Sequence, residues 1–235
     1  MTKALYLEDS YLKEFQANVV KAIDGKYIVL DQTSFFPNSG GQLHDTGTLT
    51  TSDGRSAKVI FVKKFGEDIS HEIEGDLKEG DKVTGKIDWD RRYIIMKMHT
   101  ASHIISAIFH KEAKAKITGN QLGIEKSRID FNLEDFDREK IQHYITLANQ
   151  EISKGILVET FFLPREEAMK IPGVIKLAGA LPPDIKELRI VKIGDVDIQA
   201  DGGTHVKNTS EIGQIELLKL ENKGKNNRRA YFTLK

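Results

Sequence analysis

The sequence predicts an α+β protein in which a small β-barrel domain (residues 1–88) precedes an α+β domain (residues 89–235). In the first part, short runs containing Val, Ile and Phe are separated by Asp-Gly and Glu-Gly turns, a spacing that indicates a barrel or a curled antiparallel sheet. In the second part, helix and strand patterns mix without βαβ regularity. The pattern changes at Asp88-Trp89-Asp90, and we place the domain boundary there.

Six runs of the first domain are expected to be strands. They are Phe15–Ile23, Lys26–Leu30, Gly47–Thr51, Ala57–Phe65, Ile69–Ile73 and Lys82–Ile87. A long loop, residues 31–45 (DQTSFFPNSGGQLHD), interrupts them. Its adjacent glycines give the backbone freedom, which favours a structural role. Close approach of a ligand to this loop is the alternative.

The second domain is expected to begin with a helix that has Asp90 as its N-cap and runs through the apolar stretch Tyr93–Phe109. A second helix is expected at Leu133–Lys154, with Glu134 and Asp135 in its first turn. The remaining elements are a short helix at Arg165–Lys170 and strands at Thr118–Asn132, Leu157–Leu163, Ile190–Ile193, Val196–Gln199, Gly213–Leu220 and Ala230–Leu234.

Composition narrows the class of protein. The 35 Lys and Arg residues balance 35 Asp and Glu residues, which excludes a strong global attraction to nucleic acid but allows a local basic patch. The chain has no cysteine, so a metal site must use His, Asp or Glu, and disulfides are excluded. The first residues lack the apolar core of a signal peptide, and no apolar run approaches the length of a membrane span. We therefore expect a cytoplasmic protein with no membrane partner.

Two stretches that end in histidine indicate a metal site. His99 and His103 are four residues apart in the first expected helix, so both imidazoles lie on one face and could bind one zinc ion. This spacing alone is a weak signal. Further ligands could come from Asp201 and His205, on either side of a Gly-Gly turn, although that stretch could also be an ordinary turn. Thr100 and Ser102, between the histidines, are expected to point away from the metal and pack.

Four segments carry a family resemblance. They are TSFFPNSGGQLHDTG (Thr33–Gly47), RRYIIMKMHTASHII (Arg91–Ile105), DGGTHVKNTSEIGQIEL (Asp201–Leu217) and KGKNNRRAYF (Lys223–Phe232). In this order they resemble the editing domain of alanyl-tRNA synthetases. More closely, the chain is similar to the free-standing alanyl-tRNA editing proteins called AlaX, in their medium-length form. The resemblance implies a small barrel followed by a domain of the threonyl/alanyl-tRNA synthetase second-additional-domain type.

The same resemblance implies a reaction and a metal site. Such proteins hydrolyse the ester that joins a wrong amino acid, usually serine, to alanine tRNA; whether glycine is also removed stays open at this point. The family's ligands to a single zinc ion correspond to His99, His103, His205 and position 201. Cysteine is common at that last position, whereas this chain has Asp201. A carboxylate can bind zinc, so Asp201 is either the fourth ligand or a turn residue that leaves three histidines.

Residues for substrate and tRNA follow from the same segments. Thr33 and Gln42 are expected to contact the serine hydroxyl or the attacking water. Expected phosphate contacts are Arg91, Arg92, Lys223, Lys225, Arg228 and Arg229. Two alternatives stay open at this point: a metallohydrolase of the same fold that acts on another aminoacyl-tRNA or ester, and a non-catalytic RNA-binding relative.

Overall fold

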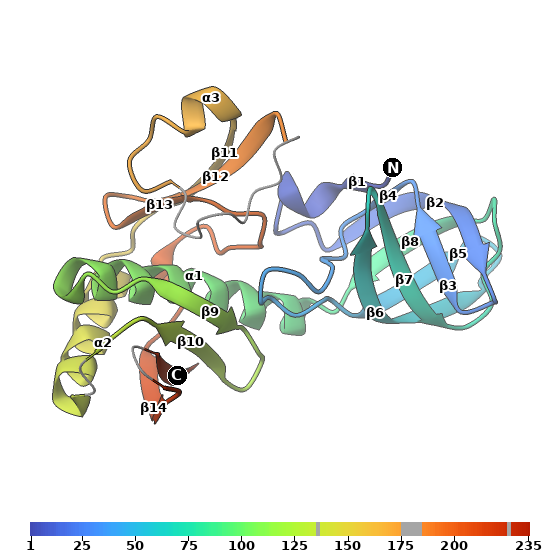
Figure 1. Ribbon diagram of the computed structural model, residues 1–235. Coiled ribbons are helices and arrows are strands. Elements are labelled where there is room, and N and C mark those ends of the chain that lie inside the picture. The colour runs from blue at the N-terminus through green and yellow to red at the C-terminus, as the bar shows by residue number, and fades with distance from the viewer. Residues whose placement is uncertain (135–136, 175–184, 225–226) are drawn as a thin grey trace. The chain divides into compact units, whose positions relative to one another are not determined.

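The computed structural model describes residues 1–134, 137–174, 185–224 and 227–235 (Figure 1). It separates into two compact units, Met1–Ile95 and Met96–Lys235. The predicted α+β class with an N-terminal barrel is confirmed. The units divide inside helix α1 (Trp89–Ala113), a little after the expected position, and the domain boundary at 88/89 stays a prediction.

The first unit contains a closed barrel of six strands in the order β2-β3-β7-β6-β5-β8. These strands are β2 (Glu14–Ile23), β3 (Tyr27–Leu30), β5 (Gly47–Thr51), β6 (Ser56–Phe65), β7 (Asp68–Glu74) and β8 (Lys82–Ile87). Each predicted strand is present, with ends shifted by at most one residue. Alternation along β2 buries Phe15, Ala17 and Val19, as expected where one face of a strand lines a core. Gly85, opposite Phe15, leaves room for this ring, because a Cβ there would lie 2.5 Å from it.

Most of the loop of residues 31–45 is buried or half-buried, and it packs against the barrel. It begins with β4 (Gln32–Thr33), which pairs in parallel with β1 (Lys3–Ala4), just before the 3-10 turn η1 (Leu5–Leu7). Phe35 and Phe36 are buried in the barrel core. The structural role favoured for the loop thus agrees with its packing.

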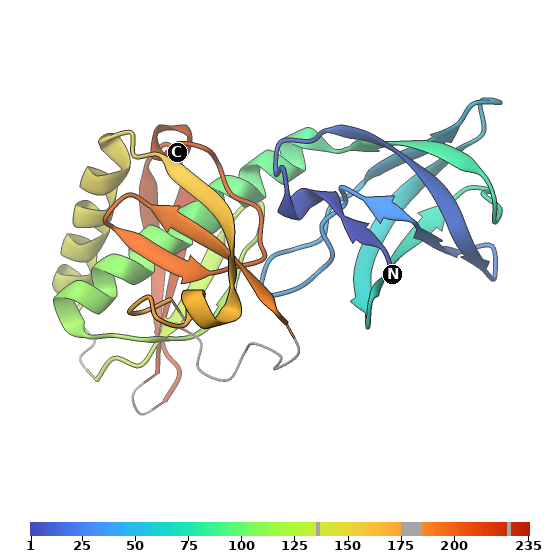
Figure 2. The same cartoon turned by 90° about the horizontal axis from the view of Figure 1, so that it is seen from above.

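In the second unit, α1 lies between two sheets (Figure 1). One sheet has the order β14-β15-β10-β9 and the other β11-β12-β13. Their strands are β9 (Ile117–Gln121), β10 (Ser127–Phe131), β11 (Val158–Pro164), β12 (Glu187–Ile193), β13 (Asp197–Ala200), β14 (Ile215–Asn222) and β15 (Arg228–Leu234). Because α1 is covered on several sides, residues 95–109 are buried almost throughout, polar ones included. Figure 2 shows the same helix passing behind β12 and β13.

Three local predictions were wrong. The N-cap of α1 is Asp88, not Asp90: its carbonyl accepts from the Arg92 amide at 3.0 Å and its carboxylate from the Arg91 amide at 3.3 Å. The single strand expected at Thr118–Asn132 is an antiparallel pair, β9 and β10.

The third error concerns the second helix. α2 (Arg138–Ser153) begins later than expected, because Asp137 caps it by accepting from the amides of Glu139 and Lys140. Glu134 therefore precedes the helix, and Asp135 lies outside the described residues.

The smaller elements are α3 (Arg165–Ala168) and the 3-10 turn η2 (Thr209–Glu211). In the part of the chain that the structure describes, no helix combines the length and the apolar character that crossing a membrane requires.

Candidate metal centre

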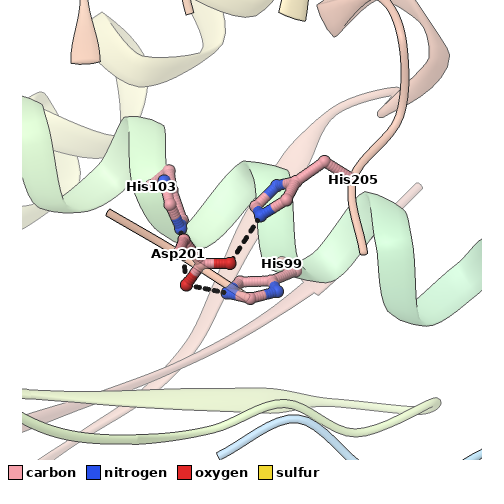
Figure 3. Close-up of side chains that lie close together, drawn as sticks. All are labelled: His99, His103, Asp201 and His205. Carbon is pink, nitrogen blue, oxygen red and sulfur yellow. Dashed lines mark hydrogen bonds and ion pairs between the residues drawn. The ribbon is translucent and has the colours of Figure 1, made fainter. Parts of the chain in front are cut away.

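Four side chains from distant parts of the second unit meet at one point (Figure 3). His99 and His103 lie one turn apart on α1, and Asp201 and His205 follow β13. Their ligand atoms all lie within 4.8 Å of one another. The helix and the distant Gly-Gly segment therefore come together as the sequence predicts, and the cluster could hold a metal ion.

The donor atoms of the cluster face a shared centre. Nε2 of His205 lies 3.1 Å from Oδ1 of Asp201. Nε2 of His99 and Nε2 of His103 lie 3.6 Å and 3.8 Å from the other carboxylate oxygen. Three imidazole nitrogens and one carboxylate form a four-donor set of the kind that zinc accepts. The residues present thus fit a small divalent cation.

Asp201 also shapes the turn. Its Oδ1 accepts a hydrogen bond from the Gly203 amide at 2.6 Å. The Arg189 guanidinium donates to the carbonyls of Asp201 and Gly203 at 2.9 Å and 3.0 Å, which fixes the segment. The two alternatives for Asp201 are therefore compatible in geometry, because the carboxylate caps the turn and faces the imidazoles. Its role as a ligand stays a prediction.

The pKa values of the three histidines in the cluster are shifted in different directions. Burial lowers the pKa of His99 well below its usual value, against the opposing charge of Asp201. Burial likewise lowers the pKa of His205 to about 4. Burial also opposes the charged form of His103, but hydrogen bonds to Asp197 and Asp201 and their charges raise its pKa to about 9. Partial burial would raise the pKa of Asp201, yet the imidazoles hold it well below its usual value. A proton on His103, or a cation among the nitrogens, balances this carboxylate.

Thr100 was expected to point away from the metal and pack; it lies behind a ligand side chain, outside the four-donor cluster, but it does more than pack. Its Oγ1 lies 3.1 Å from Nδ1 of His205 and 3.0 Å from the Met96 carbonyl, and it accepts from the Val206 amide at 3.2 Å. Ser102 donates to the His99 carbonyl at 2.7 Å. Thr100 thus contacts one of the four donor side chains directly.

Asp197 and Gln199 were missed in the sequence. Asp197 places Oδ2 3.0 Å from Nδ1 of His103, and Nε2 of Gln199 donates to the same oxygen at 2.8 Å. Both are buried. The signal that could have identified them is the spacing Asp197, Gln199, Asp201, which in a strand puts polar side chains on one face.

Thr33 and Gln42 lie in the first unit and are both buried. The Thr33 hydroxyl lies 2.9 Å from Nε2 of His71 and accepts from the Phe35 amide at 3.1 Å. The backbone N–H of Gln42 donates to the Ser39 carbonyl at 2.9 Å. Their contacts with substrate stay predictions.

The basic residues that were expected to contact tRNA differ in their burial and in the partners they already have. Arg92 was expected to contact tRNA, but its guanidinium is fully buried and bound to Asp45 and to the carbonyls of Ser34 and Ser10, so we leave it out of the phosphate contacts. Arg91 is half-buried and donates to the His44 carbonyl at 3.0 Å.

In the second unit, Lys223 is exposed and 2.8 Å from Glu221. Arg229 forms a two-point contact with Asp130 at 2.7 Å and 2.9 Å. Arg228 donates to the Glu134 carbonyl at 2.6 Å. Lys225 lies outside the described residues.

Comparison with known proteins agrees with this fold. Residues 188–231 match the family described as "Threonyl and Alanyl tRNA synthetase second additional domain", and residues 5–91 match "tRNA synthetases class II (A)". The chain is 54% identical to the "Alanyl-tRNA editing protein AlaX-M" of Methanosarcina barkeri, over 100% of this chain and 99% of that protein. It is 50% identical to the protein of the same name from Saccharolobus solfataricus, over 100% of both. It is also 42% identical to "Alanine--tRNA ligase" of Pyrobaculum aerophilum, over 94% of this chain but 25% of that protein.

The barrel, the second-additional-domain fold and the four-donor cluster define a protein of the class of editing proteins that are related to tRNA synthetases. This class is an enzyme class, that of editing deacylases, which are hydrolases. The chain belongs to the AlaX-M family of alanyl-tRNA editing proteins.

Proposed function

We propose that this chain hydrolyses the ester bond between alanine tRNA and a wrongly attached serine, with glycine as a second substrate. The observation that carries the proposal is the His99, His103, Asp201 and His205 cluster in a chain 54% identical, over its full length, to a protein named for alanyl-tRNA editing. The need for such an enzyme is physical. A pocket for alanine rejects an isostere with one added hydroxyl by only about 100-fold, so the error must be removed afterwards.

The cofactor of the proposed reaction is one zinc ion, held by these four side chains. The three convergent imidazoles and the carboxylate, a donor set that zinc accepts, support it. When bound, zinc supplies a Lewis acid next to the ester. Asp201 gives this site an oxygen donor, a harder ligand than the thiolate that is common in the family.

Other residues are proposed to bind the substrate. Gln42 and Thr33 are our candidates to contact the serine hydroxyl or to orient the attacking water. Of the two, Thr33 already has its hydroxyl bound to His71, so a contact with serine would compete with that bond. Proposed phosphate contacts are Arg91, Lys223, Lys225, Arg228 and Arg229, whose positive charges neutralise an RNA backbone without reading its sequence.

The experiment that tests the proposal is a deacylation assay on alanine tRNA that carries serine, glycine or alanine. We expect fast release of serine, release of glycine and little release of alanine. Cleavage without preference for the serine ester would favour a metallohydrolase that acts on another ester. Binding of tRNA without cleavage would favour a non-catalytic relative.

A further inference from the structure

A row of polar side chains on β13 faces the helix that carries the candidate ligands. Asp197 and Gln199 are buried residues of this strand, and Asp201 continues the two-residue spacing just beyond its end. Residues at this spacing share one face of a strand. Asp201 contributes to the cluster itself, whereas Asp197 lies behind it, on the far nitrogen of His103. The strand thus supplies one group in front of this imidazole and one behind it.

The contacts behind His103 fix which nitrogen carries the proton. Oδ2 of Asp197 lies 3.0 Å from Nδ1, and Nε2 of Gln199 lies 2.8 Å from the same oxygen and 2.6 Å from Nδ1. A carboxylate only accepts hydrogen bonds, so it takes one from the ring and one from the amide. Because Nδ1 and the Gln199 amide nitrogen are both donors in this arrangement, each directs its proton to the shared carboxylate oxygen and not to the other nitrogen. With Nδ1 donating to Asp197, Nε2, which faces Asp201, is the nitrogen of His103 that is left to bind a cation.

The contacts behind His205 lead to the same tautomer through a neutral group. The Thr100 hydroxyl donates its one proton to the Met96 carbonyl at 3.0 Å. Its oxygen therefore accepts from the Val206 amide at 3.2 Å and from Nδ1 of His205 at 3.1 Å. With Nδ1 donating to Thr100, Nε2, which lies 3.1 Å from Oδ1 of Asp201, is the nitrogen of His205 that is left to bind a cation.

We propose that Asp197 and Thr100 are positioning residues, which hold His103 and His205 as Nδ1–H tautomers so that both rings bind a divalent cation through Nε2. The inference rests on the proposed function for the identity of the cation, but not for the tautomers. Asp197 also brings a negative charge that makes the His103 ring a stronger donor, whereas Thr100 sets direction only. Outer contacts of this kind typically change metal affinity by about 10–100-fold, so Asp197 should contribute more than Thr100.

The test is a competition titration with zinc against a chelator of known affinity, on full-length protein. Asp197→Asn keeps the shape of the side chain but removes its charge, and should weaken zinc binding by about 10–100-fold. Asp195→Asn is the matched control, because it makes the same chemical change at an exposed position of the same hairpin, and it should bind zinc like the parent. Thr100→Val should weaken zinc binding by about tenfold or less, and Thr100→Ser, which restores the hydroxyl, should recover it.

A spectroscopic readout separates positioning from a merely structural role. Protein labelled with nitrogen-15 and loaded with a spin-active cadmium isotope should show coupling of the metal to Nε2 of His103 and of His205. Coupling to Nδ1 in the parent would overturn the proposal, as would parent-like zinc affinity in both Asp197→Asn and Thr100→Val. A parent that shows the Nε2 couplings but leaves the serine ester intact would support the positioning inference and overturn the proposed function.

Discussion

The two units each hold a carboxylate in a polar cluster, and the partners of these carboxylates differ. Asp45 of the first unit is fully buried and bound by the Arg92 guanidinium, with Nε 3.0 Å from both oxygens, and by the Phe36 amide at 2.6 Å. Asp201 of the second unit faces three imidazoles instead. A guanidinium is a permanent cation, so the Asp45 pair is balanced as it stands. An imidazole is charged only when protonated, so the Asp201 cluster balances its charge by taking up a proton or a metal. The Asp45–Arg92 contact is therefore a permanent ion pair, whereas the Asp201 cluster can bind a proton or a metal ion.

The histidines of the two units show the same contrast. His71 in the barrel is fully buried, and burial lowers its pKa to about 4. His103 is buried to a similar degree, but Asp197 and Asp201 raise its pKa to about 9. The opposite directions arise from the neighbours and not from burial itself. A buried histidine flanked by two carboxylates is therefore the informative one.

Loss of a ligand from the second unit should have the largest effect. His103→Ala removes one of four donors, so we expect zinc affinity to fall by more than about 100-fold, beyond the range seen for outer contacts, and hydrolysis of the serine ester to be nearly abolished. His110→Ala, an imidazole of the same helix outside the cluster, is the control. Metal content by elemental analysis and a circular dichroism spectrum check the result. A folded His103→Ala protein that retains one zinc per chain would remove the site from our account.

Substitution of Asp201 should have the next largest effect. It tests whether Asp201 is a metal ligand or only a residue that shapes the turn. Asp201→Ala should loosen zinc by about 10–100-fold or more, whereas Asp201→Cys should keep or tighten it, because thiolate is the softer donor. Both variants lose the cap on the Gly203 amide, so a difference between them reports coordination rather than turn geometry. Equal zinc affinity in the two variants and the parent would leave three histidines as the ligand set.

The two contrasting histidines predict opposite pH effects on the stability of chelator-treated protein. The unfolded value is about 6.5 for both. His71 has a lowered pKa when folded, so the unfolded chain binds more protons, and stability is lost as pH falls from about 6.5 through 4. His103 has a raised pKa, so its contribution is full below about 6.5 and is lost as pH rises through 9. Each term is on the order of 3 kcal/mol.

Urea denaturation between pH 4 and 10, with His71→Gln and His103→Gln, measures these effects on the free energy of unfolding. His71→Gln should make the acidic limb of the profile less steep, with the remaining slope from His99 and His205, whose pKa values are also lowered. His103→Gln should flatten the alkaline limb. A His103→Gln profile with an unchanged alkaline limb would contradict the carboxylate-held proton.

Thr33→Val should have the smallest effect. It tests whether Thr33 stabilises the barrel, contacts the serine of the substrate, or does both. The structure places its hydroxyl against His71, so the substitution should cost about 1–3 kcal/mol of stability through an unpaired imidazole nitrogen. If Thr33 also contacts serine, the preference for the serine ester over the alanine ester should fall by roughly tenfold at unchanged zinc content. Rates on both esters together with the unfolding free energy separate the two roles. A lower stability with an unchanged ratio would assign Thr33 to the barrel and pass the hydroxyl contact to Gln42.

Local patterns predicted much of this structure. The barrel strands were predictable because alternation such as Phe15, Ala17 and Val19 and the turns that follow are properties of neighbouring residues. The start of α2 was not, because several acidic residues precede it and the sequence does not tell that Asp137 is the one that caps the helix.

The candidate site was predicted in part for the same reason. His99 and His103 could be predicted as a pair of ligands because they are four residues apart on a helix. Asp197 reaches His103 across 94 residues of sequence, through the packing of β13 on α1. Its two-residue spacing from Gln199 and Asp201 indicates a polar strand face, but it does not tell which helix that face packs against. The role of Thr100 was missed because helix spacing puts it off the histidine face, whereas His205 approaches that flank from another segment.

The most direct test of the central claim is a zinc titration of the deacylation rate. Protein treated with a chelator is mixed with alanine tRNA that carries serine, and zinc is added in measured steps. The account predicts almost no hydrolysis at the start, then a rate that rises in proportion to zinc and levels off at one ion per chain. A rate that is already maximal in chelator-treated protein shown to contain no metal, or no hydrolysis at any zinc concentration, would contradict it.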